Sequence, residues 1–226
     1  MSKNIIITGT SSGIGLELAK FFIKNKHNVL AISRNNSDLR SLNLKGLYAV
    51  DFDITDYERY NSLNKYLNNF ENVDVLINNA GLLVNKPFED TSLEDFQKVY
   101  STNVFSVAML TKFLIKRMNN RSNVVNISSI GGVEGTLKFP GLAAYSSSKG
   151  ALNILTEMLA EEYKEQGIHF NSLALGSVQT KMLNKAFPGF KASTSAQDMA
   201  KYIYDFSMEG YKLINGKVIS ISSTTP

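Results

Sequence analysis

Cysteine and tryptophan are absent from this chain of 226 residues, and histidine occurs only at His27 and His169. Without cysteine, the protein has neither a disulfide framework nor a thiolate metal site. Two histidines so far apart in the sequence nearly exclude a zinc centre built on histidine ligands. We therefore expect a protein whose chemistry uses no metal ion.

Long apolar runs and clustered charges are lacking as well. No apolar run approaches the ~20 residues that a membrane-spanning helix needs. The 24 basic and 20 acidic residues give a net charge of +4 but are scattered, whereas nucleic-acid binding favours a basic stripe. An apolar pattern begins directly at Lys3-Asn4-Ile5-Ile6, without the features of a signal peptide. We expect a cytoplasmic protein that binds neither nucleic acid nor a membrane.

Seven short, mostly apolar segments alternate with longer helical patterns. Segments that are apolar almost throughout, rather than at every second residue, are typical of strands buried on both faces of a parallel sheet. The predicted strands are Asn4–Thr8, Asn28–Ser33, Leu47–Asp51, Asp74–Asn78, Asn123–Ser128, His169–Ala174 and Lys217–Ile221. The predicted helices are Gly15–Asn25, Asp56–Asn69, Leu93–Asn119, Ala144–Gly167 and Ala196–Met208.

This alternation predicts an α/β fold with a single doubly wound parallel sheet of about seven strands and helices on both faces. Residues 1–226 are expected to form one domain, because α/β domains often exceed the usual ~150 residues. Ligands of such folds bind at the carboxyl ends of the strands. The loops that follow the strands are therefore where we expect the chemistry.

A glycine-rich loop joins the first predicted strand to the first predicted helix, with the sequence Thr8-Gly9-Thr10-Ser11-Ser12-Gly13-Ile14-Gly15. Glycines let the backbone turn tightly and approach a diphosphate, whose charge is met by free N–H groups at the helix N-terminus. The alternative is a turn that simply packs a helix against a strand. The position between a strand and a helix at the start of the fold favours a nucleotide site.

The spacing Thr-Gly-x-x-x-Gly-x-Gly resembles that of the short-chain dehydrogenase/reductase family. Further motifs follow in the order of that family: Asp53-Ile54, Asn78-Asn79-Ala80-Gly81, Asn103, Asn126-Ile127-Ser128-Ser129, Tyr145-Ser146-Ser147-Ser148-Lys149 and Leu175-Gly176-Ser177-Val178-Gln179-Thr180. The resemblance covers roughly residues 3 to 221, nearly the whole chain. It implies a Rossmann-type fold, a nicotinamide cofactor and hydride transfer to or from a carbonyl or alcohol carbon.

The glycine loop, the end of the second predicted strand and the motifs of the family together assign residues to the cofactor. They are Gly9, Ser11, Ser12, Gly13, Ile14, Gly15, Ser33, Arg34, Asp53, Ile54, Asn79, Ala80, Gly81, Tyr145, Lys149, Gly176, Val178 and Thr180. An acidic residue at the end of the second strand binds the adenosine ribose hydroxyl of NAD in such folds. Here Ser33 stands at that place and Arg34 follows it, which suits the 2′-phosphate of NADP(H). The alternative for Arg34 is a solvated side chain stacked loosely on adenine.

Tyr145 and Lys149 lie four residues apart at the start of a predicted helix, and therefore on one helix face. The pKa of a phenol is about 10, and a neighbouring ammonium is expected to lower it by favouring the phenolate. By resemblance, Tyr145 exchanges the proton of the substrate, Ser129 orients the substrate oxygen, and Asn103 holds a water molecule that links Lys149 to solvent. Taken singly, Ser128 and Ser129 are better explained as strand-end caps, and Asn103 as a partner for buried backbone groups. Their occurrence together, in the order of the family, favours the catalytic interpretation.

The chain departs from the family pattern at four places. Leu175 replaces the proline that usually precedes Gly176, which leaves this loop freer. The long segment before Tyr145 carries Val133, Leu137, Phe139 and Leu142, which are expected to form a wall of a substrate pocket. Residues 181–195 form a short substrate lid with Met182, Leu183, Phe187 and Phe190, unless these side chains belong to the core or to a dimer interface. The tail at 221–226 lacks the usual glycine pair.

The leading hypothesis is an NADP(H)-dependent oxidoreductase that acts on a small carbonyl or secondary alcohol substrate. The alternative is a regulator or scaffold that senses NADP(H) and performs little chemistry. The resemblance implies a homodimer or homotetramer, with a dimer formed through the helices predicted at 93–119 and 144–167. Four lysines near the expected pocket favour an anionic substrate only weakly, because surface lysines are common: Lys138, Lys181, Lys185 and Lys191.

Overall fold

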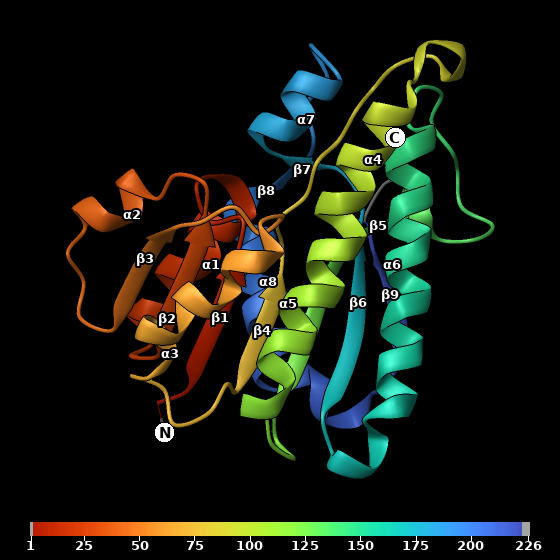
Figure 1. The fold of residues 1–226 in the computed structure, drawn as a ribbon. Helices are drawn as coiled ribbons and strands as arrows, with labels where there is room; N and C mark the ends of the chain where they lie inside the picture. The colour runs from red at the N-terminus through yellow and green to blue at the C-terminus, as the bar shows by residue number, and fades with distance from the viewer. Residues whose placement is uncertain (1, 223–226) are drawn as a thin grey trace.

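Seven parallel strands form the central sheet of the structure, a computed structural model that describes residues 2–222 (Figure 1). The strands are β1 (Asn4–Thr8), β2 (Asn28–Ser33), β3 (Leu47–Asp51), β4 (Val75–Asn78), β5 (Asn123–Ser129), β6 (His169–Leu175) and β9 (Lys217–Ile221). They lie in the order β3-β2-β1-β4-β5-β6-β9, so the chain builds outward from β1 to one edge and then from β4 to the other. This order confirms the predicted doubly wound α/β fold, and each strand boundary lies within one residue of its prediction.

Helices cover both faces of the sheet (Figure 1). The helices are α1 (Gly13–Lys24), α2 (Ser37–Ser41), α3 (Asn64–Leu67), α4 (Leu93–Tyr100), α5 (Ser106–Leu114), α6 (Ala143–Glu162), α7 (Lys181–Ala186) and α8 (Ala196–Met208). Ile5 and Ile7 of β1 pack into a core with side chains of α1 and α8. Ile6, between them, packs into a second core with side chains of α3, α5 and α6. Successive residues of a strand point to opposite faces, so both faces of β1 are buried.

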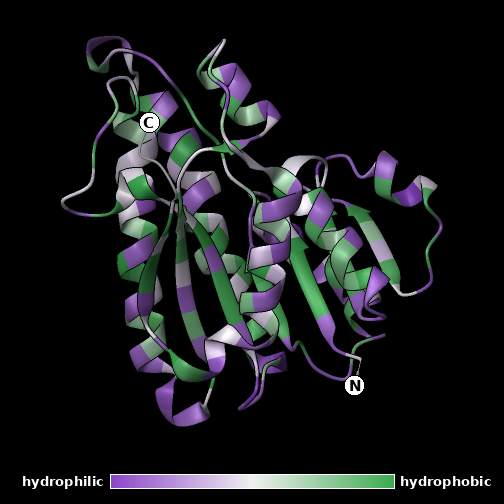
Figure 2. Cartoon of the chain, turned by 180° about the vertical axis from the view of Figure 1, so that it is seen from behind, coloured by the Kyte–Doolittle hydropathy of each residue, from purple (hydrophilic) through white to green (hydrophobic). Residues whose placement is uncertain are grey.

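The hydropathy pattern follows this layering. In Figure 2 the strands are largely hydrophobic, while the helices turn hydrophilic residues outward. A strand buried on both faces must be apolar almost throughout, which is the pattern that identified these segments in the sequence. No helix among residues 2–222 is both long and apolar enough to cross a membrane.

Two long helical predictions were only partly right. The segment predicted as the helix Asp56–Asn69 is a 3₁₀ helix at Tyr57–Leu63 followed by the single turn α3. The segment predicted as the helix Leu93–Asn119 consists of α4, a π-helical turn at Ser101–Phe105, α5 and a 3₁₀ turn at Ile115–Arg117. Helical periodicity shows where a chain coils, but it does not distinguish these hydrogen-bond patterns, which depend on tertiary contacts.

The lid region has structure that the sequence did not predict. β7 (Val178–Gln179) pairs in parallel with β8 (Thr194–Ser195), and α7 lies between them. The lid therefore starts and ends at one small two-stranded sheet beside the carboxyl edge of the central sheet. Of the predicted tail, residues 223–226 lie outside the part of the chain that the structure describes.

Exposed apolar side chains gather on two neighbouring long helices. Phe105 and Met109 lie one turn apart where the π-helical turn meets α5, and Ile154 and Met158 lie one turn apart on α6. Their exposed fractions range from 38% to 61%. The helical segment of α4 and α5 runs alongside α6 in Figures 1 and 2. This helix pair therefore presents apolar surface outward, away from the sheet.

Candidate active site

A cavity of about 960 Å³ lies at the carboxyl edge of the central sheet. It extends from the ends of β2 and β3, past the glycine loop, to the start of α6 and the lid. Every residue that the sequence assigned to the cofactor lines this cavity except Gly15, and the predicted catalytic Ser129 lines it as well. Asn103 and Gly15 do not line the cavity; each contacts residues that do. The topology thus brings to one place motifs that stand far apart in the sequence, as the carboxyl-end rule predicts.

The glycine loop is shaped by backbone conformations and contacts that exclude side chains. Gly9 and Gly13 have φ angles of +74° and +59°, in the left-handed region that favours glycine. A Cβ atom on Gly9 would lie 2.7 Å from the Cα of Ala80. A Cβ atom on Gly15 would lie 2.3 Å from the carbonyl oxygen of Gly9. Gly15 therefore serves the loop by close packing and does not itself face the cavity.

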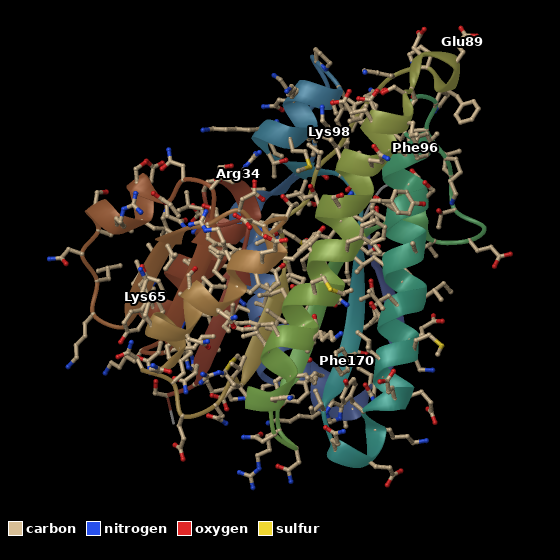
Figure 3. All side chains as sticks on the ribbon, viewed as in Figure 1. Arg34, Lys65, Glu89, Phe96, Lys98 and Phe170 are labelled. Carbon is tan, nitrogen blue, oxygen red and sulfur yellow. The ribbon has the colours of Figure 1, made fainter. Side chains whose placement is uncertain are left out.

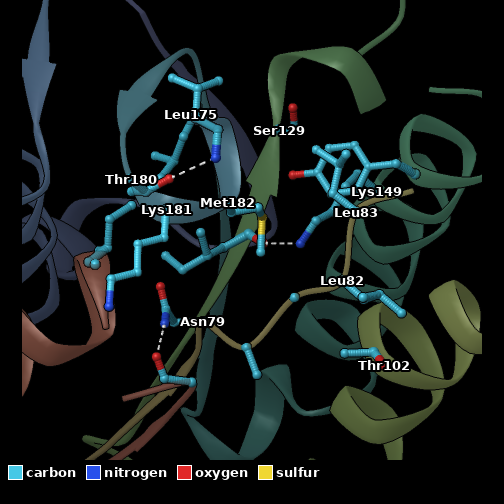
Figure 4. A pocket seen from close by; sticks show the side chains of 18 of the residues that line it. Asn79, Leu82, Leu83, Thr102, Ser129, Lys149, Leu175, Thr180, Lys181 and Met182 are labelled. Carbon is cyan, nitrogen blue, oxygen red and sulfur yellow. Dashed lines mark hydrogen bonds between the residues drawn. The ribbon is translucent and has the colours of Figure 1, made fainter. Parts of the chain in front are cut away.

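Thr8 and Asn79 fasten this loop to the end of β4. The hydroxyl of Thr8 accepts hydrogen bonds from the backbone N–H groups of Asn79 and Ala80, at 3.1 and 3.0 Å. The side-chain amide of Asn79 donates to the carbonyl oxygens of Thr8 and Gly9. Asn79 lines the cavity, but its amide nitrogen is used to hold the loop in place (Figure 4).

The first turn of α1 presents the features of an anion site. Its N-terminal neighbour Ser12 forms no side-chain cap, and no acidic residue stands in the first turn. Ser11, Ser12, Gly13 and Ile14 all line the cavity. The N-terminal N–H groups and the positive end of the helix dipole are thus available to a diphosphate. Together with the glycine contacts, these residues fit a nicotinamide dinucleotide.

Arg34 and Ser33 form the end of the cavity beside β2 and β3. Arg34 is exposed, as Figure 3 shows, and forms no ion pair among the described residues. The Ser33 hydroxyl donates to the carbonyl oxygen of Asn35 at 2.9 Å. The carboxylate nearest in the sheet register is Asp51 of β3, opposite Ser33.

Asp51 is already engaged by two donors. Its carboxylate lies 2.8 Å from the guanidinium of Arg40 and accepts a 2.7 Å hydrogen bond from the backbone N–H of Asn36. The hydrogen bond from Arg40, followed by the one from Asn36, lowers the pKa of Asp51 below its usual value. Asp51 is therefore held by two donors, and Arg34 keeps its positive charge without an ion pair among the described residues.

Tyr145 and Lys149 lie one turn apart near the start of α6, next to Ser129 at the end of β5. The Lys149 side chain is buried, with 3% of the residue exposed. Its ammonium donates a 2.7 Å hydrogen bond to the carbonyl oxygen of Ile127 and lies 5.7 Å from the ring centroid of Tyr145 (Figure 4). Tyr145 is partly exposed, toward the cavity that it lines.

Burial shifts the two titrating groups in opposite directions. It raises the pKa of Tyr145 to about 12, although a hydrogen bond with Ser129 acts the other way. It lowers the pKa of Lys149 to about 8. The sequence led us to expect that the ammonium and a bound oxidised cofactor lower the pKa of the tyrosine. In the structure, desolvation outweighs the hydrogen bond with Ser129 and raises it. Each shift favours the uncharged form of its group.

Asn103 lies in the π-helical turn and is fully buried. Its side chain accepts a hydrogen bond from the backbone N–H of Leu82 at 2.8 Å and donates to the Leu82 carbonyl oxygen. It also donates to the Ser148 hydroxyl at 2.9 Å. This side chain therefore ties the segment after β4 to α6 at Ser148, the residue directly before Lys149. Its predicted role toward a water molecule stays a prediction.

The lid faces the cavity with apolar side chains. The Thr180 hydroxyl caps α7 by accepting from the Leu183 N–H at 3.2 Å, and its methyl carbon lies 3.4 Å from where Gly13 would carry a Cβ. The side-chain amide of Asn85 donates to the Ala186 carbonyl oxygen at 2.8 Å, which holds the far end of α7. The four predicted lid side chains all line the cavity: Met182, Leu183, Phe187 and Phe190. Their position favours the lid interpretation over a core or dimer role.

The predicted wall before Tyr145 is half right. Phe139 and Leu142 line the cavity, and the rings of Phe139 and Phe187 lie 6.4 Å apart. Val133 and Leu137 do not line it, because the loop that carries them turns outward and leaves Leu137 exposed. Of the four lysines near the pocket, only Lys181 lines the cavity.

Several lining residues were not assigned from the sequence. They are Ile32, Phe52, Thr55, Tyr57, Leu82, Leu83, Glu94, Gln97, Lys98, Ser101, Thr102, Ile127, Ile130 and Ser177. Phe52, Leu82 and Ser177 follow strand ends closely, so a wider use of the carboxyl-end rule would have found them. Those on α4 carry no such signal, because only the packing of α4 against α6 brings them to the cavity.

The opposed pKa shifts predict a pH dependence of stability for the cofactor-free protein. Between pH 8 and 10.5 the unfolded chain binds one more proton at Lys149 than the folded chain, so the unfolding free energy rises with pH. The Lys149→Met variant should lose this rise, which amounts to about 3 kcal/mol over the window. Between pH 10 and 12 the folded chain binds one more proton at Tyr145 than the unfolded chain does. In this window Tyr145 therefore lowers the unfolding free energy as the pH rises.

Urea unfolding at several pH values measures how the unfolding free energy of the wild-type protein and of the Lys149→Met variant changes with pH. The exposed Lys164→Met variant is the matched control. A Lys149→Met variant whose pH slope equals that of the wild-type protein would contradict the burial argument.

Comparison with known proteins identifies the family. The pattern of the family described as short chain dehydrogenase matches residues 3–189. Carbonyl reductase (NADPH) 2 of Sus scrofa is 33% identical over 179 residues, which are 78% of this chain and 72% of its own.

Solved structures agree in fold over nearly the whole chain. The structure of 4-hydroxyisoleucine dehydrogenase complexed with NADH has a TM-score of 0.86 and 27% identity, and the match covers 98% of this chain and 97% of that one. The structure of ElxO with NADP bound has a TM-score of 0.85 and 33% identity, and the match again covers 98% and 97%. The chain therefore belongs to the short-chain dehydrogenase/reductase family, whose oxidoreductases act on CH–OH and C=O groups with nicotinamide cofactors.

Proposed function

We propose that this protein is an NADP(H)-dependent oxidoreductase that interconverts a carbonyl compound and a secondary alcohol. One observation carries the proposal. A single cavity joins Arg34 and the glycine loop at one end to Tyr145, Ser129 and Lys149 at the other. A dinucleotide that places its phosphates at the first turn of α1 would reach the catalytic residues with its nicotinamide ring.

The bound cofactor supplies the hydride that is transferred to the carbonyl carbon, or accepts it in the reverse direction. The chain provides the surroundings for this step. The N–H groups at the start of α1 meet the diphosphate, and Thr180 faces the same loop from the lid. At the other end, the Lys149 ammonium lies 3.7 Å from where Gly81 would carry a Cβ, within reach of a ribose hydroxyl in that space.

Tyr145 supplies the proton. In reduction its hydroxyl donates a proton to the carbonyl oxygen of the substrate, and in oxidation it accepts that proton. Ser129, which hydrogen-bonds Tyr145, polarises the same oxygen. Lys149 is charged below pH about 8, and its ammonium, 5.7 Å from the centroid of the Tyr145 ring, would then stabilise the phenolate. Asn103 acts as a positioning residue, because it holds Leu82 and Ser148 on either side of the site.

The Tyr145→Phe variant tests this assignment. Loss of the proton donor should lower kcat for ketone reduction by roughly 100- to 10,000-fold, the usual contribution of general acid catalysis. NADPH affinity should change little, because the ring stays in place. Steady-state kinetics and fluorescence titration of NADPH measure the two quantities.

The matched control is Tyr202→Phe, which removes an exposed hydroxyl from α8. Full turnover by Tyr145→Phe would eliminate the proposed role of Tyr145. Tight NADPH binding by the wild-type protein without turnover of any carbonyl compound would favour the regulator hypothesis instead.

The preference for NADP(H) rests on the charges beside β2 and β3. Arg34 lines the cavity without an ion-pair partner among residues 2–222. Asp51, the carboxylate opposite Ser33, is held by Arg40 and the Asn36 backbone. A 2′-phosphate would meet the guanidinium of Arg34, and the end of β2 carries Ser33 in place of a carboxylate that would repel it.

Arg34→Gln should weaken NADPH binding by roughly 10- to 150-fold, the range for a hydrogen bond to a charged group. NADH binding should change by less than about 2-fold, since NADH lacks the phosphate that Arg34 contacts. Dissociation constants for both cofactors, with Arg121→Gln as a control outside the cavity, measure the effect. Equal weakening of both cofactors, or a wild-type preference for NADH, would contradict the argument.

We further propose a homodimer that packs the exposed apolar side chains of the α5 and α6 segments against a second copy. Phe105, Met109, Ile154 and Met158 are the anchors, since an apolar surface of this kind marks an interface. Met158→Glu should shift sedimentation velocity toward the monomer, whereas Leu213→Glu, at a 91% exposed position of another surface, should not. A wild-type protein that is monomeric at tens of micromolar would refute this interface.

A further inference from the structure

The cavity continues past Tyr145 into a space that a dinucleotide lying on the glycine loop leaves for substrate. This space is bounded by the segment before α6, the lid and the residues after β4 (Figure 4). Met182 reaches in from the lid, where its terminal methyl lies 3.9 Å from the position of a Cβ on Gly81. The substrate therefore has to fit against the inner surface of the lid.

The walls of this space are apolar. Six side chains carry them: Leu83, Phe139, Leu142, Met182, Phe187 and Phe190. The contact between Phe139 and Phe187, 6.4 Å between ring centroids, closes the wall between the α6 segment and the lid. The bond from Asn85 to the Ala186 carbonyl oxygen holds α7, and with it these lid side chains, against the segment after β4.

Three charged side chains of the cavity lie away from this space. Arg34 and Asp53 lie at the ends of β2 and β3, at the opposite end of the cavity. Lys181 begins α7 next to Thr180, which lies against Gly13, so its ammonium is on the glycine-loop side (Figure 4).

The remaining charges nearby are already paired. Glu94 and Lys98 of α4 form an ion pair of 2.6 Å with each other. The Lys138 ammonium is bound by the carbonyl oxygen of Val133 and by Thr136, and Lys138 does not line the cavity. Lys149 is buried behind Tyr145 and donates to the Ile127 carbonyl oxygen. Apart from it, a charged group on the substrate would lose its hydration here without meeting a free counter-ion, which is strongly unfavourable.

We infer that the substrate is an uncharged carbonyl compound, or the matching secondary alcohol, that carries an apolar ring or chain. The apolar part lies against Phe139, Phe187 and Met182, and the reacting oxygen lies at Tyr145 and Ser129. Uncharged polar side chains on the α4 side, Gln97 and Thr102, can bond one neutral hydroxyl or carbonyl group. This inference rests on the proposed function and adds the chemical class of its substrate.

Three ketones of closely similar size test it: 4-(4-tert-butylphenyl)butan-2-one and its analogues with a carboxylate or a trimethylammonium group in place of the tert-butyl group. The neutral ketone should show a kcat/KM with NADPH at least about 100-fold above either charged analogue, because an unpaired charge is costly to bury. A carboxylate or ammonium analogue that is reduced as well as the neutral ketone would overturn the inference and leave the proposed function standing.

Binding to the NADPH-loaded Tyr145→Phe protein, followed by calorimetry, gives a readout that needs no turnover. The neutral ketone should bind and the charged analogues should not. If no ketone is reduced by the wild-type protein, the proposed function fails, and this binding experiment still decides the substrate class. Absence of neutral-ketone binding, or tighter binding of a charged analogue, would overturn the inference.

Phe187→Lys places a free cation in the wall. It should lower kcat/KM for the neutral ketone by at least about 10-fold and raise that for the carboxylate analogue. Phe88→Lys makes the same change at a 72% exposed position outside the cavity and is the matched control. If Phe187→Lys leaves the ratio of kcat/KM between the neutral ketone and the carboxylate analogue unchanged, Phe187 does not contact the substrate, and this result would overturn the inference.

Discussion

The close approach of the glycine loop to the end of β4 organises the whole carboxyl edge of this fold. Gly9 lies against the backbone of Ala80, and Gly15 lies against Gly9, at distances that no Cβ atom could fill. The Thr8 hydroxyl and the Asn79 amide complete the junction with hydrogen bonds to backbone groups. Because β1 and β4 are neighbours in the sheet, this junction places the first turn of α1 beside the segment that leads to Asn103.

Desolvation sets the chemistry at the other end of the cavity. The Lys149 side chain is enclosed by β5 and α6 and donates a hydrogen bond to the Ile127 carbonyl oxygen. Burial favours the neutral forms of Lys149 and Tyr145, so each positive charge near the phenol has a large effect on its proton affinity. An apolar lid extends this low-dielectric region over the substrate. The same side chains that exclude water are those from which we infer an uncharged substrate.

The fold and many residues of the candidate site could be predicted from the sequence, because local patterns determine them. Strands buried on both faces must be apolar throughout, so the seven strands and their parallel arrangement were predictable. The glycine loop could be recognised because its tight turn needs positive φ angles. The Tyr145–Lys149 pair could be recognised because a spacing of four residues places both side chains on one helix face. The role of Gly15 in packing the loop, and the bonds of Asn103 to Leu82 and Ser148, depend on residues far away in sequence.

Other features arise only when the chain is folded. The engagement of Asp51 by Arg40, which leaves Arg34 as the free charge, requires the position of α2 beside β3. The raised pKa of Tyr145 depends on burial, which no local pattern reports. The inward orientation of Phe187, and the outward turn of the loop with Leu137, follow from how the lid packs against the segment before α6.

The central claim is that one cavity holds the cofactor from the first turn of α1 to Tyr145. A crystal structure of the protein with NADP⁺ tests it most directly. The account predicts the diphosphate at the N–H groups of Ser12–Ile14, the 2′-phosphate at Arg34 and the nicotinamide ring beside Tyr145 and Lys149. A cofactor bound with its nicotinamide ring near Arg34, or outside this cavity, would contradict the account.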